Sequence, residues 1–385
     1  MTKPMLKPSV SAIGPSMPDL LADIRLRRKE FEQQQHISQD IIEGFRALGV
    51  YRALVAKRFG GDERTPAAFC ELIETIARAD GSAGWVASFG IGGIYLSALP
   101  FETLQELYAN GPDIVFAGGI FPPQPAEKVA GGLKVSGRWG FASGCMGADM
   151  VGVGVMPRVD AGQSLPRMAV MPRAKVRIER NWNVMGLVGT GSHDLVVEDV
   201  TVPEAWTFVR GGKSSLSEPL YRYPALAFAA QVLAVVGLGV ARGALDEVYE
   251  MASGRTSVTG APQLGDRVYV QLEMAKAEAD LRAARAFFYD AINDVWATLT
   301  SGAPVASPSQ ISMLRLSATH ATRVAADVAR RAQMVTGMTG VFETSPIAAQ
   351  VRDAQMVTQH AFMGEITYQN AGAMLFGHNP LPGYL

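Results

Sequence analysis

Residues 137–144 read GRWGFASG, and residues 182–194 read WNVMGLVGTGSHD. The first stretch puts a Trp, a Phe and a Ser at the end of an expected strand that closes on a Gly. The rings could stack on a planar ligand while the Ser hydroxyl bonds its heteroatom edge. By spacing alone, an ordinary strand and turn with its rings in the core is the better interpretation. The second stretch, taken alone, is a glycine-rich loop before a strand.

Both stretches lie among short segments that are rich in Val and Ile and bounded by Gly, Pro or Asp, which predicts a sheet over about 113–208. Before and after this region, apolar residues recur at helical spacing. The fold class expected is therefore α+β, mainly α. Three domains are expected: an N-terminal helical domain (1–112), a middle β domain (113–210) and a C-terminal four-helix bundle (211–385).

Long amphipathic helices are predicted in the last domain, and the Ser307-Pro308-Ser309-Gln310 start supplies capping chemistry to one of them. The charge-free apolar run over 225–241 is shorter than the ~20 residues that a membrane-spanning helix needs. We expect it to be a buried helix and expect no membrane partner. The long amphipathic helices are predicted over 268–299, 307–337 and 351–376.

Composition narrows the classes of function. The 385 residues include 35 Lys plus Arg against 36 Asp plus Glu, a net charge of −1, so no basic excess favours a nucleic-acid partner. Hydrophobic residues make up 48%, enough to fill a large core. Two cysteines exclude a disulfide framework, and no continuous apolar segment marks a secretory signal at the N-terminus. These features predict a cytoplasmic protein.

Several common chemistries have no motif here. The sequence contains no GxxxxGK[ST] loop, no GxGxxG between a strand and a helix, no HExxH and no GxSxG. The glycines of the run over 236–243 lie inside a helical apolar stretch, so close helix packing is the better interpretation. The five histidines are scattered, and no metal site is predicted.

Stretches from four successive regions of the chain carry a family resemblance. ARADGSAGWVAS lies in the first helical region, the two quoted stretches lie in the β region, SGRTSVTGAPQLGDRVYVQLEMAK opens the bundle, and VTGMTGVFETSPIAAQVRDAQMVTQH follows near the C-terminus. This series resembles the acyl-CoA dehydrogenase fold, and more closely its group D branch, the oxygenase components of two-component flavin-dependent monooxygenases. The resemblance runs nearly end to end.

The resemblance implies a homotetramer that binds reduced flavin, FADH2 or FMNH2, made by a separate NAD(P)H:flavin reductase. With O2 as co-substrate, such a protein forms a C4a-hydroperoxyflavin and hydroxylates a small aromatic or heteroaromatic compound. Phenols, indoles or indole acids and polycyclic compounds all remain open as substrates, with a phenol or indole type preferred. No Arg or Lys is placed by the sequence to recognise a carboxylate.

Two alternatives from other classes are an acyl-CoA dehydrogenase and a non-catalytic scaffold of the same fold. Dehydrogenation needs a carboxylate base to remove a C–H proton. One family position for that base, counted from Arg352, falls on Ala361, and no Asp or Glu occurs between Tyr223 and Leu245, where the other lies. The dehydrogenase is therefore the weaker hypothesis.

His360, beside Ala361, becomes the expected catalytic residue, since an imidazole can accept a substrate proton or donate to a developing oxygen anion. The alternative interpretation is a structural histidine at a helix end whose hydrogen bonds are made within the fold. Ser143 is expected to bind the flavin N5 edge, and His193 either to be structural or to support a residue of the site. Val188 stands where the family often has Arg. Further cofactor-binding residues implied are Trp139, Phe141, Thr190, Ser192, Arg255, Gln271, Gly337 and Gly340. Possible walls of the substrate pocket are Phe89, Tyr95, Phe121, Trp139 and Phe362.

Overall fold

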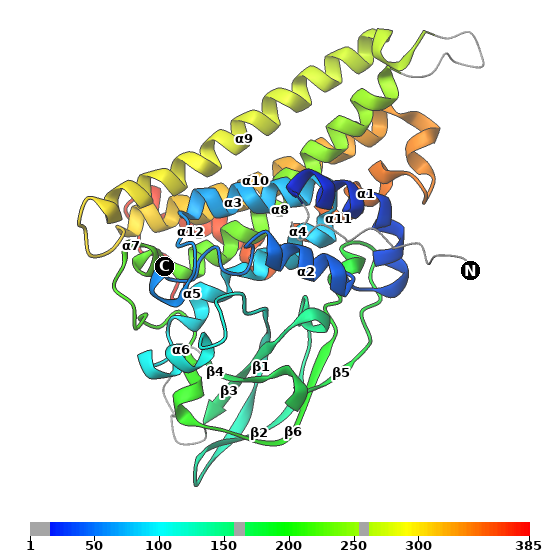
Figure 1. Ribbon diagram of the computed structural model, residues 1–385. Coiled ribbons are helices and arrows are strands. Elements are labelled where there is room, and N and C mark those ends of the chain that lie inside the picture. The colour runs from blue at the N-terminus through cyan, green and yellow to red at the C-terminus, as the bar shows by residue number, and fades with distance from the viewer. Residues whose placement is uncertain (1–15, 158–165, 254–261) are drawn as a thin grey trace, which may run out of the picture.

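The computed structural model describes residues 16–157, 166–253 and 262–385. A group of helices forms the upper part of the molecule and a twisted sheet the lower part (Figure 1). The first helical group comprises α1 (Met17–Gln34), α2 (Gln39–Ala47), α3 (Pro66–Ala79), α4 (Gly81–Ser88), α5 (Gly92–Leu96) and α6 (Phe101–Leu107). This group covers the sheet from the bundle side, so the expected α+β fold with its central β region is confirmed.

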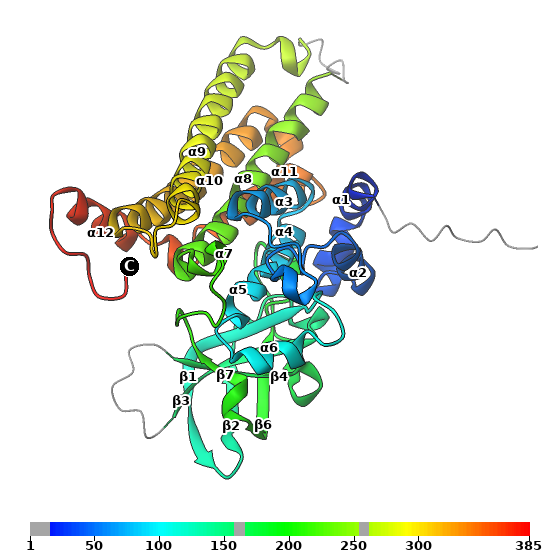
Figure 2. The same cartoon turned by 60° about the vertical axis from the view of Figure 1, so that its left-hand side comes forward.

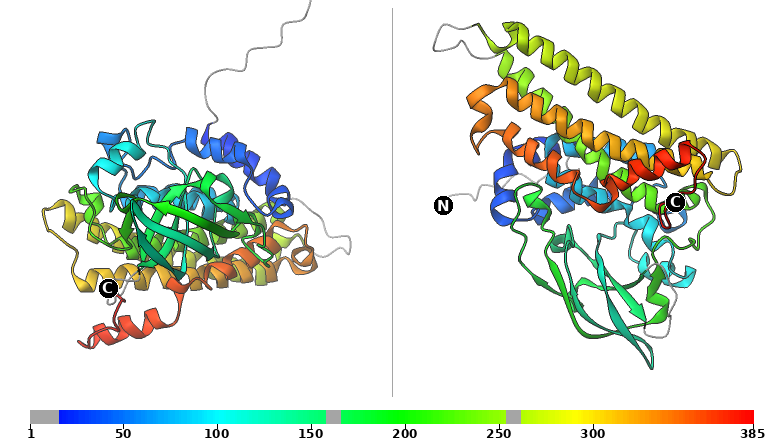
Figure 3. Two further views of the ribbon diagram at one scale, coloured as in Figure 1. Left: turned by 90° about the horizontal axis from the view of Figure 1, so that it is seen from below. Right: turned by 180° about the vertical axis from the view of Figure 1, so that it is seen from behind.

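The sheet has seven strands in the order β5-β6-β2-β1-β3-β4-β7. Among the described strands, the β1–β3 pair is parallel and the other neighbours are antiparallel. Seen from below, the strands lie in front of the helices (Figure 3, left). Two features differ from the sequence prediction: β1 continues through three prolines, and the short β7 was not among the expected strands. The strands are β1 (Phe116–Val129), β2 (Gly132–Trp139), β3 (Met150–Pro157), β4 (Arg167–Pro172), β5 (Arg177–Glu179), β6 (Asp194–Val202) and β7 (Thr207–Val209).

The C-terminal helices pack around α8, whose apolar run is buried as expected. By length and composition α8 could cross a membrane, but 83% of its most apolar window is buried inside the fold, against α3, α10 and α11. The predicted capping box of α10 is confirmed, since Ser307 Oγ accepts from Gln310 N at 3.2 Å and Gln310 Oε1 accepts from Ser307 N at 3.0 Å. The helices are α7 (Pro219–Arg222), α8 (Ala225–Ala252), α9 (Val268–Thr300), α10 (Pro308–Val335), α11 (Pro346–Val357) and α12 (Ile366–Leu375).

The single helix expected over 351–376 is wrong. It is two helices, α11 and α12, separated by residues 358–365 and the short 3-10 turn Ala361–Met363. The apolar period continues through this break, which is why the pattern alone missed it. Viewed from behind, α12 and the C-terminal segment run along the outer side of the bundle (Figure 3, right). The break carries His360.

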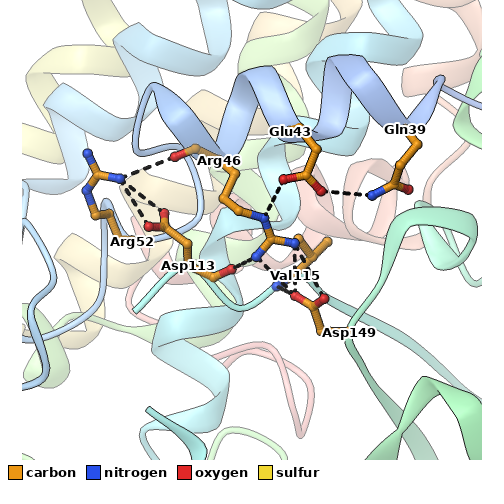
Figure 4. A network of polar contacts seen from close by, with 7 residues as sticks. All are labelled: Gln39, Glu43, Arg46, Arg52, Asp113, Val115 and Asp149. Atoms are coloured by element: carbon orange, nitrogen blue, oxygen red, sulfur yellow. Dashed lines mark hydrogen bonds and ion pairs between the residues drawn. The ribbon is translucent and has the colours of Figure 1, made fainter. Parts of the chain in front are cut away.

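A polar network fastens α2 to the start of the sheet (Figure 4). Arg46 forms ion pairs with Glu43 at 3.1 Å and with Asp149 at 3.2 Å, and it donates to the backbone oxygen of Asp113. Asp149 also accepts from Val115 N at 2.8 Å, just before β1. Because one carboxylate serves both the backbone of the β region and a helix of the first group, the network fixes how these two parts meet.

Candidate functional site

The two quoted stretches come together beside α4. Trp139 ends β2, and the turn that follows bonds to the second stretch through Gly144 N to Thr190 O at 2.9 Å and Ala142 N to His193 O at 3.2 Å. Gly144 has φ of 72°, in the left-handed region that favours glycine. The loop over 182–194, which suggested no role when taken alone, therefore packs against the turn after β2, and the two segments form one site.

A chain of buried hydroxyls lines this junction. Ser143 Oγ and Ser192 Oγ lie 2.7 Å apart, and Ser192 Oγ and Thr190 Oγ1 lie 2.7 Å apart. Thr190 donates to Leu187 O at 2.8 Å, and Trp85 Nε1 donates to Ser143 Oγ at 3.0 Å. Trp85 Nε1 can only donate and Leu187 O can only accept, so the direction of the chain is fixed at both ends. Ser143 therefore donates to Ser192, and Ser192 donates to Thr190. Ser143 Oγ then keeps one free lone pair, so it can accept a hydrogen bond from a ligand.

Trp85 connects the hydroxyl chain to His360. Its indole, 7% exposed, meets the His360 imidazole edge-on with ring centroids 5.9 Å apart. The His360 ring is in turn 5.0 Å from the Phe362 ring. Sequence reasoning did not select Trp85, although it lies in the ARADGSAGWVAS stretch that carried the resemblance. The structure thus brings Ser143, His360 and Phe362 to one place through a residue that was missed.

The protonation state of His360 follows from its surroundings. Burial, and then the positive charge of Arg210, lower the pKa of His360 from 6.5 to about 4, so the imidazole is neutral at pH 7. Nδ1 accepts from Phe362 N at 3.2 Å, which caps the Ala361–Met363 turn. The single ring proton must then sit on Nε2. His360 therefore caps the turn through Nδ1 and can donate a hydrogen bond through Nε2. Of its two expected roles, this tautomer favours donation to a developing oxygen anion over acceptance of a substrate proton.

Arg210 and Tyr95 complete the cluster around Phe362. The Arg210 guanidinium lies over the Phe362 ring, with its carbon 5.5 Å from the centroid. Burial raises the pKa of Tyr95, while the nearby charge of Arg210 acts in the opposite direction. Arg210 follows β7, and no local pattern singled it out in the sequence. The cluster combines an aromatic wall, a phenol and a cation.

The loop of the second stretch is held in place by two helices. Ser82 Oγ, on α4, accepts from Gly189 N at 3.1 Å, and Asp353 Oδ1, on α11, accepts from Leu187 N at 2.6 Å. Burial and the nearby charge of Asp80 raise the pKa of Asp353 from 3.8 to about 7. Burial also raises the pKa of Asp80. Through its hydrogen bond to Leu187, Asp353 therefore fixes the position of the hydroxyl chain relative to the helices.

His193 forms contacts that hold the backbone of the loop. Its Nδ1 accepts from Asn181 N at 3.2 Å and from Trp182 N at 3.1 Å, and the side chain is fully buried. Burial, and then the charge of Arg180, lower the pKa of His193, so the ring stays neutral. It shapes the loop without facing the cluster around His360.

Trp139 requires a correction. The sequence suggested it for stacking on the cofactor and as a pocket wall, but its ring is 0% exposed in the core of the sheet and its Nε1 donates to Gly154 O at 2.8 Å. Phe141 instead is 76% exposed, with φ of 60°, and stands edge-on to Trp182 at 6.0 Å. Of the other suggested pocket walls, Phe121 is 58% exposed on β1, and Phe89 is half-buried against the helical core.

Three further predicted cofactor residues, Gln271, Gly337 and Gly340, lie where α9 begins and α10 ends, at the end of the bundle away from the sheet. Gln271 is exposed on the first turn of α9, where its amide donates to Gly265 O at 2.8 Å. Gly337 and Gly340 lie in the turn after α10, and a Cβ on Gly340 would meet Thr336 Oγ1 at 2.3 Å. Arg255 lies outside the described residues. Within one chain, this end of α9 and α10 is far from the sheet (Figure 1).

The residues at the β2 turn fit the expected flavin. An isoalloxazine ring needs an apolar surface for its face and hydrogen-bonding groups for its heteroatom edge. Phe141 provides exposed aromatic surface with the half-buried Trp182 ring edge-on to it, and Ser143, which keeps a free lone pair, lies in the same turn as Phe141. These residues would hold the ring, while Trp85 and His360 lie on the side of Ser143 that leads to Phe362.

The chain is similar to known proteins over nearly its whole length. A family profile described as "Acyl-CoA dehydrogenase, C-terminal domain" matches residues 231–365. The chain is 63% identical over 380 residues to an indole-3-acetate monooxygenase of Pseudomonas putida, covering 98% of this chain and 97% of the relative. It is 30% identical over 298 residues to the oxygenase component of an FADH2-dependent resorcinol hydroxylase of a Rhizobium species, covering 72% of this chain and 71% of that one. The crystal structure of the HsaA monooxygenase of Mycobacterium tuberculosis superposes with a TM-score of 0.88 at 26% identity, covering 96% of this chain and 97% of that one.

Proposed function

Because the chain belongs to the oxygenase components of two-component flavin-dependent monooxygenases, which have the acyl-CoA dehydrogenase fold, we propose that its substrate is indole-3-acetate. The observation that carries this proposal is the 63% identity, over 98% of the chain, to a monooxygenase named for that compound. The general activity is that of the family: reduced flavin and O2 are used to hydroxylate a small aromatic or heteroaromatic compound. The reduced flavin comes from a separate reductase.

The cofactor supplies two electrons and the oxygen-transferring chemistry, with one oxygen atom entering the substrate and the other leaving as water. This chain's own residues supply position and hydrogen bonds. Ser143 offers an acceptor at the flavin edge, and the neutral His360 offers Nε2–H as a donor towards developing negative charge. Trp85 and Phe362 give the aromatic surroundings that an indole ring would contact.

The same geometry argues against an acyl-CoA dehydrogenase. Ala361 occupies the position expected for a dehydrogenase base and is exposed, while its neighbour His360 is held neutral with its proton on Nε2. A neutral imidazole fixed in that tautomer presents a donor where α-proton removal needs a carboxylate acceptor.

The test is oxygen incorporation. The purified chain is supplied with a flavin reductase, NADH, flavin and 18O2, with indole-3-acetate, indole, a phenol or butyryl-CoA as substrate. We expect indole-3-acetate to gain one 18O atom and to be used with the highest kcat/KM. Oxygenation of the phenol with no incorporation into indole-3-acetate would contradict the proposed substrate and leave the family activity intact.

We further propose that the chain assembles as a homotetramer and is cytoplasmic. Large exposed apolar side chains gather in two places, and monomeric proteins rarely expose such clusters without a partner. One cluster lies where α9 begins and α10 ends, and the other on α12 and the C-terminal segment that stands outside the bundle (Figure 2). Two separate self-contacts per chain are what a tetramer of dihedral symmetry needs. The first cluster contains Val268, Tyr269, Leu272, Met334, Met338, Val341 and Phe342, and the second contains Ile366, Leu375, Phe376, Leu381 and Leu385.

A further inference from the structure

Arg210 forms no ion pair with any described carboxylate, whereas two arginines on nearby helices, Arg323 and Arg352, each have one. Arg323 pairs with Glu365 at 3.3 Å, and Arg352 pairs with Glu32 at 3.2 Å. Within the described parts of the chain, no carboxylate forms an ion pair with Arg210, whose side chain is half-buried. A partly desolvated guanidinium without a counter-ion is unfavourable unless a ligand supplies the negative charge.

The surroundings of Arg210 are those of the reacting site. Its guanidinium lies over Phe362, and it is close enough to His360 and Tyr95 for its charge to act to lower the pKa values of both groups. An aromatic ring beside a cation and a phenol is suited to a ligand with an aromatic part and an anionic end. A guanidinium binds a carboxylate through two parallel hydrogen bonds, and a phenol can add a third.

The other arginine at this ring is already occupied. Arg315 is 8% exposed and lies between the Phe362 and Tyr384 rings, 5.9 Å and 4.8 Å from their centroids. Its Nη1 donates to Tyr384 O at 2.6 Å, so it fastens the C-terminal segment to α10. Burial lowers the pKa of Arg315, which is expected of a packed cation without an anion beside it. Arg210 is the more accessible of the two cations.

We propose that Arg210, assisted by the Tyr95 hydroxyl, binds the carboxylate of an aryl-acetate substrate and so selects acids over neutral indoles. This inference rests on the proposed function, because it assumes that the substrate carries an acetate group. It assigns to Arg210 a role in specificity and leaves the oxygen-transferring step to the flavin and the residues around it.

The test compares indole-3-acetate with indole-3-acetamide, which has nearly the same shape and no charge. For Arg210→Gln we expect KM for the acid to rise by about 10- to 100-fold, the usual loss for a hydrogen-bonded charge pair, while kcat changes little and KM for the amide changes less than about threefold. Arg210→Lys should fall between the wild type and Arg210→Gln, and Tyr95→Phe should raise KM for the acid by about three- to tenfold.

Binding is measured separately, by equilibrium dialysis of each ligand with anaerobic protein and reduced flavin, so that affinity does not depend on turnover. Arg177→Gln, an exposed arginine at the sheet edge that pairs with Glu179, is the matched control and should behave as wild type. Equal losses for acid and amide in Arg210→Gln, or an unchanged preference for the acid, would overturn the inference. A wild type that does not oxygenate indole-3-acetate would instead overturn the proposed function.

Discussion

Ser143 holds the position where the hydroxyl chain meets the expected cofactor. Its proton is committed to Ser192 and one lone pair to Trp85, which leaves a single acceptor site. For Ser143→Ala we therefore expect loss of the hydrogen bond to the cofactor, about 1–2 kcal/mol, or roughly five- to thirtyfold in the rate of the step that it supports. The measurement is H2O2 released per product formed, which should rise. Ser136→Ala, an exposed serine on β2, is the control, and unchanged coupling in Ser143→Ala would remove Ser143 from the site.

His360 should act without changing its charge. Because its pKa is about 4, the rate of hydroxylation should show no His360 titration between pH 5 and 8. His360→Ala removes a preorganised donor and should lower the hydroxylation rate by about 10²- to 10³-fold while reduced flavin still binds. His378→Ala, an exposed histidine near the C-terminus, is the control. Hydroxylation at the wild-type rate would leave His360 with its capping role alone.

His360 also has a predictable effect on stability. Its folded pKa lies below the unfolded value of 6.5, so as pH falls from 6.5 to 4 the unfolded state binds the proton first. The folded state therefore loses stability through that window. In His360→Gln this loss should be absent from the pH dependence of the unfolding free energy, which provides a readout independent of activity.

At the scale of elements, the sequence predicted what periodicity and turn chemistry encode. The order of helices and strands, the buried α8 and the capped start of α10 were all predictable. The break between α11 and α12 was not, because it interrupts no apolar period and is held by the His360 cap on Phe362 N, a local contact with no sequence pattern. The cluster was only half predictable: Ser143 and His360 lie in motifs, whereas Arg210 reaches Phe362 only through the tertiary fold.

The loop over 186–192 should respond to the charge of Asp353. The folded pKa of Asp353, about 7, lies above its usual 3.8, so between these pH values the folded state keeps a proton that the unfolded state has lost. Stability from this group therefore falls as pH rises through the window. Asn cannot ionise and can still accept a hydrogen bond from Leu187 N. The change in unfolding free energy caused by Asp353→Asn should therefore be more favourable at pH 8 than at pH 5, by on the order of 1–3 kcal/mol. Parallel pH curves for the two proteins would show that Asp353 ionises normally.

At the scale of the whole molecule, the predicted flavin residues divide between two ends of one chain. Ser143 lies at the sheet, whereas Gln271, Gly337 and Gly340 lie at the far end of the bundle, next to the exposed apolar cluster there. If two chains pack through that cluster, the bundle end of one subunit can reach the flavin held by its partner. Assembly and flavin binding should then depend on the same surface.

Phe342→Glu tests this dependence, because Phe342 is 62% exposed in the bundle-end cluster and a charge there would have to be desolvated on assembly. By light scattering we expect the wild type at four times the 41.1 kDa chain mass, and Phe342→Glu as a smaller species with flavin affinity reduced by about tenfold or more. Leu26→Glu is the matched control, since Leu26 is 85% exposed on α1 and outside both clusters. A monomeric wild type would contradict the tetramer, and a smaller Phe342→Glu species with unchanged flavin affinity would show that each chain binds its flavin alone.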